Sequence, residues 1–355
     1  MADRLRAKAP LVVVLGGGGF LGSAVVRELA GRAVRVRVVS RTPTPLPHGG
    51  PAEVTGWLAD LTEPGETARA VRGADAVLHL AARFAGAASA AGGGGSANWR
   101  VAAGDEAAEA VNVGVMRDVV RALEGRTGPG PLPVVLFTGS TSQAGVTARV
   151  RIDGSEPDDP VGVYARQKLA AERLLTDASA RGVLRGAGLR LTTVFGHGPH
   201  STVADRGVVS AMARRALAGQ PLSLWHDGTV LRDLLYVDDA ARAVVAALGR
   251  PAELAGRHWL VGTGRGVPLG EVFRDLSGAV ARRTGAPAVP VVPVAPPHQS
   301  EATDFRSVEV DSTAFRAVTG WAPRVGLREA LERTVAALAG PVRRAPADQP
   351  LSTSP

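Results

Sequence analysis

The 355-residue sequence contains no cysteine, only two tyrosines and only two lysines. Without cysteine, the chain can form neither a disulfide framework nor a thiolate metal site. It contains no run of about 18 apolar residues, which argues against a membrane span. The first ten residues, MADRLRAKAP, also lack the apolar stretch of a secretory signal. We therefore expect a cytoplasmic globular protein that has no membrane partner.

Aromatic residues are scarce at 4% of the chain, whereas the 41 lysines and arginines outnumber the 33 acidic residues. Nucleic-acid binding needs a basic stripe and aromatic side chains that stack on bases. Here the arginines are spread along the whole chain, and few aromatic residues accompany them. We therefore predict no nucleic-acid partner, although the net charge of +8 is compatible with an anionic small molecule.

Short apolar runs alternate with longer amphipathic segments. Helical periods lie at residues 22–32 and 111–125, among others. Repeated strand–helix units predict an α/β fold, a Rossmann-type doubly wound parallel sheet with helices on both faces. A smaller C-terminal α/β part is expected to bind the substrate. The runs that read as strands are residues 11–16, 34–40, 76–82, 133–139, 189–196 and 234–239.

The same pattern predicts how the chain is divided. A Gly/Ala-rich loop at residues 84–100 is either a mobile lid or simply disordered. A proline-rich stretch at 286–297 is expected to be an extended connector rather than a central strand. The predicted parts are a flexible arm at 1–10, a dinucleotide-binding domain at 11–194 to which 229–250 return, a substrate-binding part at 195–228 and 251–340, and a disordered tail at 341–355.

A glycine-rich loop follows the first predicted strand and opens a helix. Gly16, Gly19 and Gly22 stand in a G-x-x-G-x-x-G arrangement that includes Phe20 and Leu21. Such glycines permit a tight turn, let the backbone approach a pyrophosphate and let helix and strand pack closely. The phosphates then meet the positive end of the helix. The loop therefore predicts a dinucleotide site.

The end of the second predicted strand indicates which dinucleotide is bound. An NAD site usually carries Asp or Glu there, to accept a hydrogen bond from the ribose 2′-hydroxyl. This chain has Ser40 and Arg41 instead, which can bind a 2′-phosphate. We therefore predict NADP(H). The alternative is that Arg41 is one of many surface arginines.

Two further segments are placed to contact the cofactor. Asp60 and Leu61 follow a third short strand, where a carboxylate can accept a hydrogen bond from an adenine amine. Leu80, Ala81 and Ala82 follow the fourth strand, where small side chains allow the cofactor to approach closely. Core packing explains these alanines equally well.

The segment VGVYARQKLAAERLL, residues 161–175, contains one of the two tyrosines and one of the two lysines. In a helix, Tyr164 and Lys168 are four residues apart and lie on one face. A nearby ammonium favours the phenolate, so we expect Lys168 to lower the pKa of Tyr164 from its ordinary value of about 10. Tyr164 would then exchange a proton near neutral pH, and Lys168 could also bind ribose hydroxyls.

Hydroxyl side chains stand at the end of the predicted strand at 133–139 and directly after it. They are Thr138, Ser140, Thr141 and Ser142, at the carboxyl edge where α/β sheets bind ligands. One such hydroxyl can orient a reacting carbonyl group. A serine in this place is otherwise a helix cap or a turn residue.

Together these motifs resemble the extended short-chain dehydrogenase/reductase family over residues 11–340. The resemblance implies that Tyr164 is the general acid or base, that Lys168 binds the nicotinamide ribose, and that Ser140 binds the substrate oxygen. It also implies a structural role for Asn112 and a homodimer. The motifs, in the family's order, are GGGGFLG, ADLT, HLAA, VNVG, FTGSTSQAG, YARQK, LRLTTVFGHGP, VLRDLLYVDDAARAV, HWLVGTG and TGWAPRVGLREALERTV.

The resemblance also suggests residues that contact the substrate, namely Thr141, Thr193 and Arg232 beside Ser140. Arg232 stands where nucleotide-sugar members of the family hold a pyrophosphate, a role that suits the fork of arginine. The alternative is an exposed ion pair with Asp233. Many members have asparagine at the position of Thr193, so this residue weakens the expectation of the family's diphosphate packing.

Family dehydratases carry an Asp-Glu pair where this chain has Thr141 and Ser142, so dehydration is not expected. Residues 151–175, 206–239 and 303–321 are similar to bacterial 4-ketoreductases of deoxysugar biosynthesis. The resemblance therefore implies NADPH-dependent reduction of the 4-keto group of a TDP-activated 4-keto-6-deoxyhexose. The alternatives are an NAD-dependent nucleotide-sugar epimerase and a non-catalytic NADP-binding protein.

Overall fold

The computed structural model describes residues 9–84, 101–126, 130–198, 200–201, 203–296 and 300–340. Most of the predicted N-terminal arm, the predicted loop after Phe84 and the predicted tail at 341–355 lie outside the described residues.

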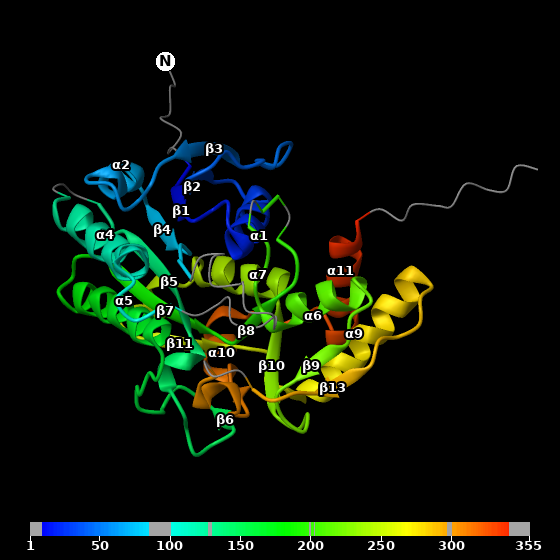
Figure 1. The fold of residues 1–355 in the computed structure, drawn as a ribbon. Coiled ribbons are helices and arrows are strands. Elements are labelled where there is room, and N and C mark those ends of the chain that lie inside the picture. Colours follow the sequence, from blue (N-terminus) through cyan, green and yellow to red (C-terminus); the bar gives the residue numbers. More distant parts are fainter. Residues whose placement is uncertain are drawn as a thin grey trace, which may run out of the picture.

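A seven-stranded parallel sheet forms the centre of the fold (Figure 1). Its strands are β1 (Leu11–Leu15), β2 (Arg35–Ser40), β3 (Glu53–Leu58), β4 (Ala76–His79), β5 (Val134–Ser140), β7 (Arg185–Leu191) and β11 (His258–Val261). They lie in the order β11-β7-β5-β4-β1-β2-β3, and every neighbouring pair is parallel. The order reverses between β1 and β4, which makes the sheet doubly wound. The predicted Rossmann-type fold is confirmed.

Helices cover both faces of this sheet, which is why the central strand β1 is apolar throughout. Successive side chains of β1 point to opposite faces. Val12 and Val14 join the core under α1 and α7, whereas Val13 and Leu15 join the core under α2, α4 and α5. These helices are α1 (Phe20–Ala30), α2 (Glu66–Val71), α4 (Val115–Glu124), α5 (Val163–Ala180) and α7 (Val237–Ala247).

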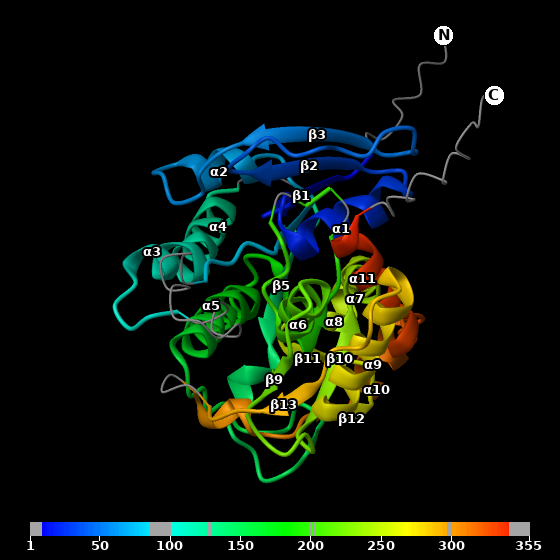
Figure 2. The same ribbon diagram turned by 45° about the vertical axis from the view of Figure 1, so that its right-hand side comes forward.

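A smaller part, built from short sheets and helices, packs beside the large sheet (Figure 2). Its short sheets have the strand orders β12-β10-β8, β13-β9 and β14-β6. The strands are β6 (Arg151–Ile152), β8 (Thr193–Phe195), β9 (Leu222–Leu224), β10 (Leu231–Tyr236), β12 (Gly266–Pro268), β13 (Val291–Pro293) and β14 (Glu309–Val310). The remaining helices are α3 (Glu106–Glu109), α6 (Val208–Leu217), α8 (Pro251–Leu254), α9 (Leu269–Thr284), α10 (Thr313–Thr319) and α11 (Leu327–Ala339).

Four segments differ from the expectation, and one of them is the run at 76–82, which is a strand only to His79. The run at 189–196 is two strands, β7 and β8, because the chain leaves the large sheet at Thr192 and continues in the small one. The run at 234–239 is a strand only to Tyr236, where α7 follows at once. Strand β11 lies within 251–340, the range expected to bind substrate, yet it is the edge strand of the large sheet. The division into functional parts stays a prediction.

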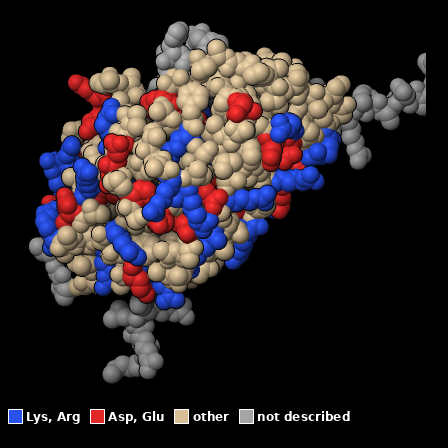
Figure 3. All heavy atoms as spheres, turned by 90° about the horizontal axis from the view of Figure 1, so that it is seen from below, with Lys and Arg blue, Asp and Glu red and all other residues tan. Residues whose placement is uncertain are grey.

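The surface carries both signs of charge. On the face shown in Figure 3, basic and acidic side chains are interspersed. This agrees with the spread of arginines along the sequence. Within the described ranges, the helices are too short or too polar to span a bilayer.

Candidate active site

The carboxyl ends of the central strands border a cavity of about 1370 Å³. Because ligand pockets of about 300–1,000 Å³ hold one small molecule, this cavity has room for a dinucleotide and a second ligand. All but one of the predicted site residues line it. These are Gly16, Gly19, Phe20, Leu21, Ser40, Arg41, Asp60, Leu61, Leu80, Ala81, Ala82, Ser140, Thr141, Tyr164, Lys168, Thr193 and Arg232.

The glycine loop between β1 and α1 fits a bound pyrophosphate. Gly16 has a φ of +83°, and a Cβ on it would lie 2.8 Å from the Ala81 backbone. Gly22, the one predicted residue away from the cavity wall, packs behind the loop, where a Cβ would lie 2.1 Å from the Gly16 oxygen. Gly19 begins the helix without a side-chain cap. The first amides of α1 therefore have no intrahelical acceptor and can bind an anion.

The end of β2 presents Ser40 and Arg41 to the same cavity. The Ser40 hydroxyl donates to the Thr42 carbonyl oxygen at 2.8 Å, whereas Arg41 is exposed. Asp60 lies nearby and accepts hydrogen bonds from the Thr62 hydroxyl and amide, at 2.7 and 3.0 Å. These bonds lower the pKa of Asp60. The carboxylate is therefore ionised and can still accept from an amine.

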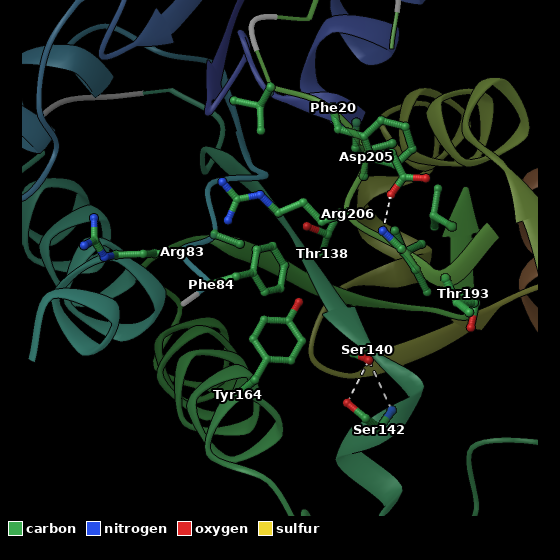
Figure 4. Close-up of a pocket in the computed structure, with 18 of the residues that line it drawn as sticks. Phe20, Arg83, Phe84, Thr138, Ser140, Ser142, Tyr164, Thr193, Asp205 and Arg206 are labelled. Atoms are coloured by element: carbon green, nitrogen blue, oxygen red, sulfur yellow. Dashed lines mark hydrogen bonds between the residues drawn. The ribbon is translucent and has the colours of Figure 1, made fainter. Parts of the chain in front are cut away.

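Tyr164 and Lys168 project from the first turns of α5, on one face as predicted. Figure 4 shows the Tyr164 ring reaching toward β5, with Phe84 against it. The two ring centroids are 5.0 Å apart. Lys168 is only 2% exposed, and its Nζ donates to the Thr138 carbonyl oxygen at 2.9 Å. The same Nζ lies 5.7 Å from the centroid of the Tyr164 ring.

Burial sets the protonation of this pair. It raises the pKa of Tyr164 above its ordinary value, and it lowers the pKa of Lys168 to about 7. The expectation that Lys168 lowers the pKa of Tyr164 is therefore wrong in this structure. Desolvation disfavours both charged forms and outweighs the attraction between ammonium and phenolate. Tyr164 is consequently a protonated hydroxyl at neutral pH.

Ser140 ends β5 and also caps the short helical turn that follows, at Thr141–Ala144. Its Oγ lies 2.8 Å from the Ser142 Oγ and accepts from the Ser142 amide at 3.2 Å. Its own amide donates to Gln143 Oε1 at 2.8 Å. Ser140 is therefore a helix cap, the alternative that the sequence left open, and it also lines the cavity (Figure 4).

Asn112 lies in a π-helical segment, Ala110–Gly114, that precedes α4. Its side chain is fully buried and bonds both backbone groups of Arg83, at 2.8 and 3.0 Å. It also donates to Gln167 on α5 at 2.8 Å. Asn112 therefore holds the chain before Phe84 against the helix that carries Tyr164.

Arg232 is less available to a ligand than the sequence suggests. Its guanidinium donates to four backbone carbonyl oxygens, those of Leu231, Thr303, Asp304 and Arg306. Burial lowers its pKa to about 10. The alternative pairing with Asp233 does not occur either, because that carboxylate accepts from the Thr263, Gly264 and Val310 amides.

Sequence reasoning missed many residues of the cavity wall, among them Phe84 and Arg306. Arg306 is 8% exposed, and one of its nitrogens donates to the Gly145 carbonyl oxygen. Its Nε and Nη2 have no hydrogen-bond partner among the described residues. No spacing in the sequence marks either residue, because each reaches the cavity through contacts that are distant along the chain.

A model of the NAD dependent epimerase/dehydratase family matches residues 12–262, which is most of the chain. The dTDP-L-rhamnose 4-epimerase of Burkholderia thailandensis is 26% identical over 90% of this chain and 92% of its own length. The dTDP-6-deoxy-L-talose 4-dehydrogenase (NAD(P)(+)) of Kitasatospora kifunensis is 29% identical over 90% of this chain and 93% of its own length.

A solved structure shares the fold. MoeE5, in complex with UDP-glucuronic acid and NAD, superposes with a TM-score of 0.72 at 26% identity. The match covers 92% of this chain and 97% of that one. The similarity therefore includes both the large sheet and the smaller part.

The buried Lys168 predicts how stability depends on pH. Its folded pKa of about 7 lies below the unfolded value of 10.5, so between these values the unfolded chain binds more protons. The free energy of unfolding should therefore rise with pH from about 7 to 10, by about 1 kcal/mol per pH unit relative to Lys168→Met. Urea unfolding of both proteins across this range measures the difference. Parallel pH curves for the two proteins would contradict the assignment.

Proposed function

This chain belongs to the NAD dependent epimerase/dehydratase family, and we propose that it is an NADPH-dependent ketoreductase within it. The proposed substrate is a TDP-activated 4-keto-6-deoxyhexose, reduced at its 4-keto group. The observation that carries the proposal is that Ser140 and Tyr164 share one cavity wall with Thr141 and Ser142. Hydroxyls there can assist reduction of a ketone, whereas dehydration needs carboxylates.

The side chains divide the proposed reaction between them. When bound, the nicotinamide cofactor supplies a hydride to the carbonyl carbon. Tyr164 donates its phenolic proton to the forming alkoxide, since its hydroxyl is protonated at neutral pH. Ser140 binds the same oxygen and orients it. The ammonium form of Lys168 stabilises the phenolate that remains until Tyr164 regains a proton from solvent.

NADPH rather than NADH is proposed from the end of β2. Ser40 and Arg41 line the cavity there, and Arg41 is exposed and able to pair with a 2′-phosphate. Asp60 is close by but lies at the end of the next strand and is bonded to Thr62. The ribose end of the site therefore offers an arginine and a hydroxyl where NAD sites usually carry an acid.

The diphosphate of the substrate is proposed to meet Arg306 in addition to Arg232. Arg306 lines the cavity and has two nitrogens without protein partners among the described residues. Both nitrogens are buried in this structure, so the guanidinium fork would donate to phosphate oxygens after turning toward the cavity. Arg232 would then act mainly by holding the segment at 303–306, to whose carbonyl groups it donates.

A nucleotide-sugar epimerase is the second candidate. The B. thailandensis relative carries that activity in its name, whereas the K. kifunensis relative is named a dTDP-6-deoxy-L-talose 4-dehydrogenase, which acts at the same carbon as the proposed reduction. An epimerase oxidises and re-reduces one carbon and leaves its cofactor unchanged overall. Net cofactor use therefore separates the two candidates.

Turnover with TDP-4-keto-6-deoxyglucose tests the proposal. We expect stoichiometric oxidation of NADPH, followed by its absorbance, and a 4-hydroxy product identified by NMR. Tyr164→Phe should lower kcat by about 10²–10⁴-fold because it removes the proton donor, while NADPH still binds. Interconversion of two sugar nucleotides without net NADPH oxidation would instead establish the epimerase. Full activity of Tyr164→Phe would contradict the assigned proton donor.

Cofactor choice has its own test. Arg41→Ala should weaken NADPH binding about tenfold, because a charge-assisted bond to the 2′-phosphate is lost, and should leave NADH binding unchanged. Arg32→Ala is a matched control, since Arg32 is exposed on the same domain but lies away from the cavity. Fluorescence titration with both cofactors measures the ratio. Equal effects of Arg41→Ala on NADPH and NADH would overturn the assignment.

A further inference from the structure

Behind Ser140, three buried polar side chains connect the elements that carry the candidate site. Gln143 follows β5, Glu172 lies on α5, and Arg190 lies on β7. They are 0%, 4% and 2% exposed, respectively. None of the three lines the cavity, so contact with a ligand does not explain them.

These side chains form a continuous chain of hydrogen bonds. The Ser140 amide donates to Gln143 Oε1 at 2.8 Å, and Gln143 Nε2 donates to Glu172 Oε2 at 3.1 Å. Arg190 then donates to both oxygens of Glu172, at 2.5 to 3.2 Å. It also pairs with Asp158 at 2.7 Å, in the loop that leads into α5.

The charge of Glu172 fixes which way the Gln143 amide points. A carboxylate only accepts hydrogen bonds, so it must face the NH₂ end of the amide. The amide oxygen is thereby directed at the Ser140 backbone. The identity of Glu172, and not only its size, therefore determines how the turn after β5 is held.

Neighbouring glycines leave the room that this arrangement needs. A Cβ on Gly139 would lie 2.6 Å from Gln143 Oε1, and a Cβ on Gly188 would lie 2.8 Å from Glu172 Oε2. Both positions are on central strands, where glycine is unfavourable. A buried ion pair, moreover, is weak support for stability, because desolvation offsets its attraction. Stability alone therefore accounts poorly for this cluster.

We propose that Gln143 and Glu172 are positioning residues that set Ser140 relative to Tyr164. Glu172 lies two turns beyond Tyr164 on the same helix, so the chain of bonds fixes the end of β5 against the helix that carries the proton donor. This inference rests on the proposed function, in which both hydroxyls meet one substrate oxygen. Misplacing a reacting group by about 1 Å can cost about a hundredfold in rate.

An exchange of the two side chains tests the proposal. Gln143→Glu places two carboxylates in contact and should lower kcat about a hundredfold, with KM within about twofold. Glu172→Gln removes the fixed polarity and should lower kcat about tenfold. The double variant restores the polarity. The new amide at position 172 on α5 can donate to the new carboxylate at position 143, and that carboxylate can accept from the Ser140 amide. The double variant should therefore recover at least about tenfold over Gln143→Glu.

Asp239→Asn is the matched control. Asp239 is fully buried and accepts from the Arg324 and Val325 amides at 2.7 and 2.9 Å, away from the cavity. This variant should lower the melting temperature and leave kcat unchanged. The positioning role would be overturned if the losses in kcat of the two single variants simply add in the double variant. It would also be overturned if the variants lower the melting temperature and leave kcat unchanged.

Hydrogen exchange separates this inference from the proposed function. The Ser140 amide should exchange faster in each single variant and return toward the wild-type rate in the double variant, whether or not a substrate is known. Should wild-type protein reduce no ketone while exchange follows this pattern, the proposed function fails and the positioning of Ser140 stands. If the wild-type enzyme is active but the single variants change neither the exchange of the Ser140 amide nor kcat, the positioning role is rejected and the proposed function stands.

Discussion

The candidate site depends on the register of the parallel sheet, which brings the carboxyl ends of the central strands to one edge. Leu15 pairs with His79, His79 with Phe137, and Phe137 with Gly188. Strands β1 and β4 therefore end side by side, whereas β5 and β7 stay paired for three more residues, to Ser140 and Leu191. The glycine loop, the alanines after β4 and the serine that ends β5 meet in one cavity for this reason. Tyr164 and Lys168 join them because α5 packs on β5 and β7.

Burial then sets the chemistry that this edge can perform. Tyr164 keeps its proton, and Lys168 has its pKa lowered to about 7, because neither charged form is well solvated. A protonated phenol suits donation of a proton to a forming alkoxide, and the ammonium form of Lys168 can stabilise the phenolate that is left. Gln143 and Glu172 serve the same site from behind, since their hydrogen bonds fix the turn that begins at Ser140.

Local patterns in the sequence predicted the sheet, the glycine loop and the placement of Tyr164 and Lys168 on one helical face, because each depends on spacing alone. The pKa of Tyr164 was predicted in the wrong direction, since desolvation comes from neighbours such as Phe84 that are distant in sequence. Arg306 was missed for a similar reason, as it reaches the cavity from a segment far beyond the helix that carries Tyr164. The hydrogen bonds from Arg232 to backbone carbonyl groups could not be predicted from the sequence for the same reason.

In the proposed reaction, a hydride leaves the cofactor irreversibly and binds to a ketone carbon. The most direct measurement uses NADPH dideuterated at nicotinamide C4, with TDP-4-keto-6-deoxyglucose as the acceptor and NMR of the product. We expect a deuterium bound to C4 of the product sugar and an equal amount of oxidised cofactor. A product that carries no deuterium at C4, or sugar interconversion with the NADPH left intact, would contradict the proposed reaction.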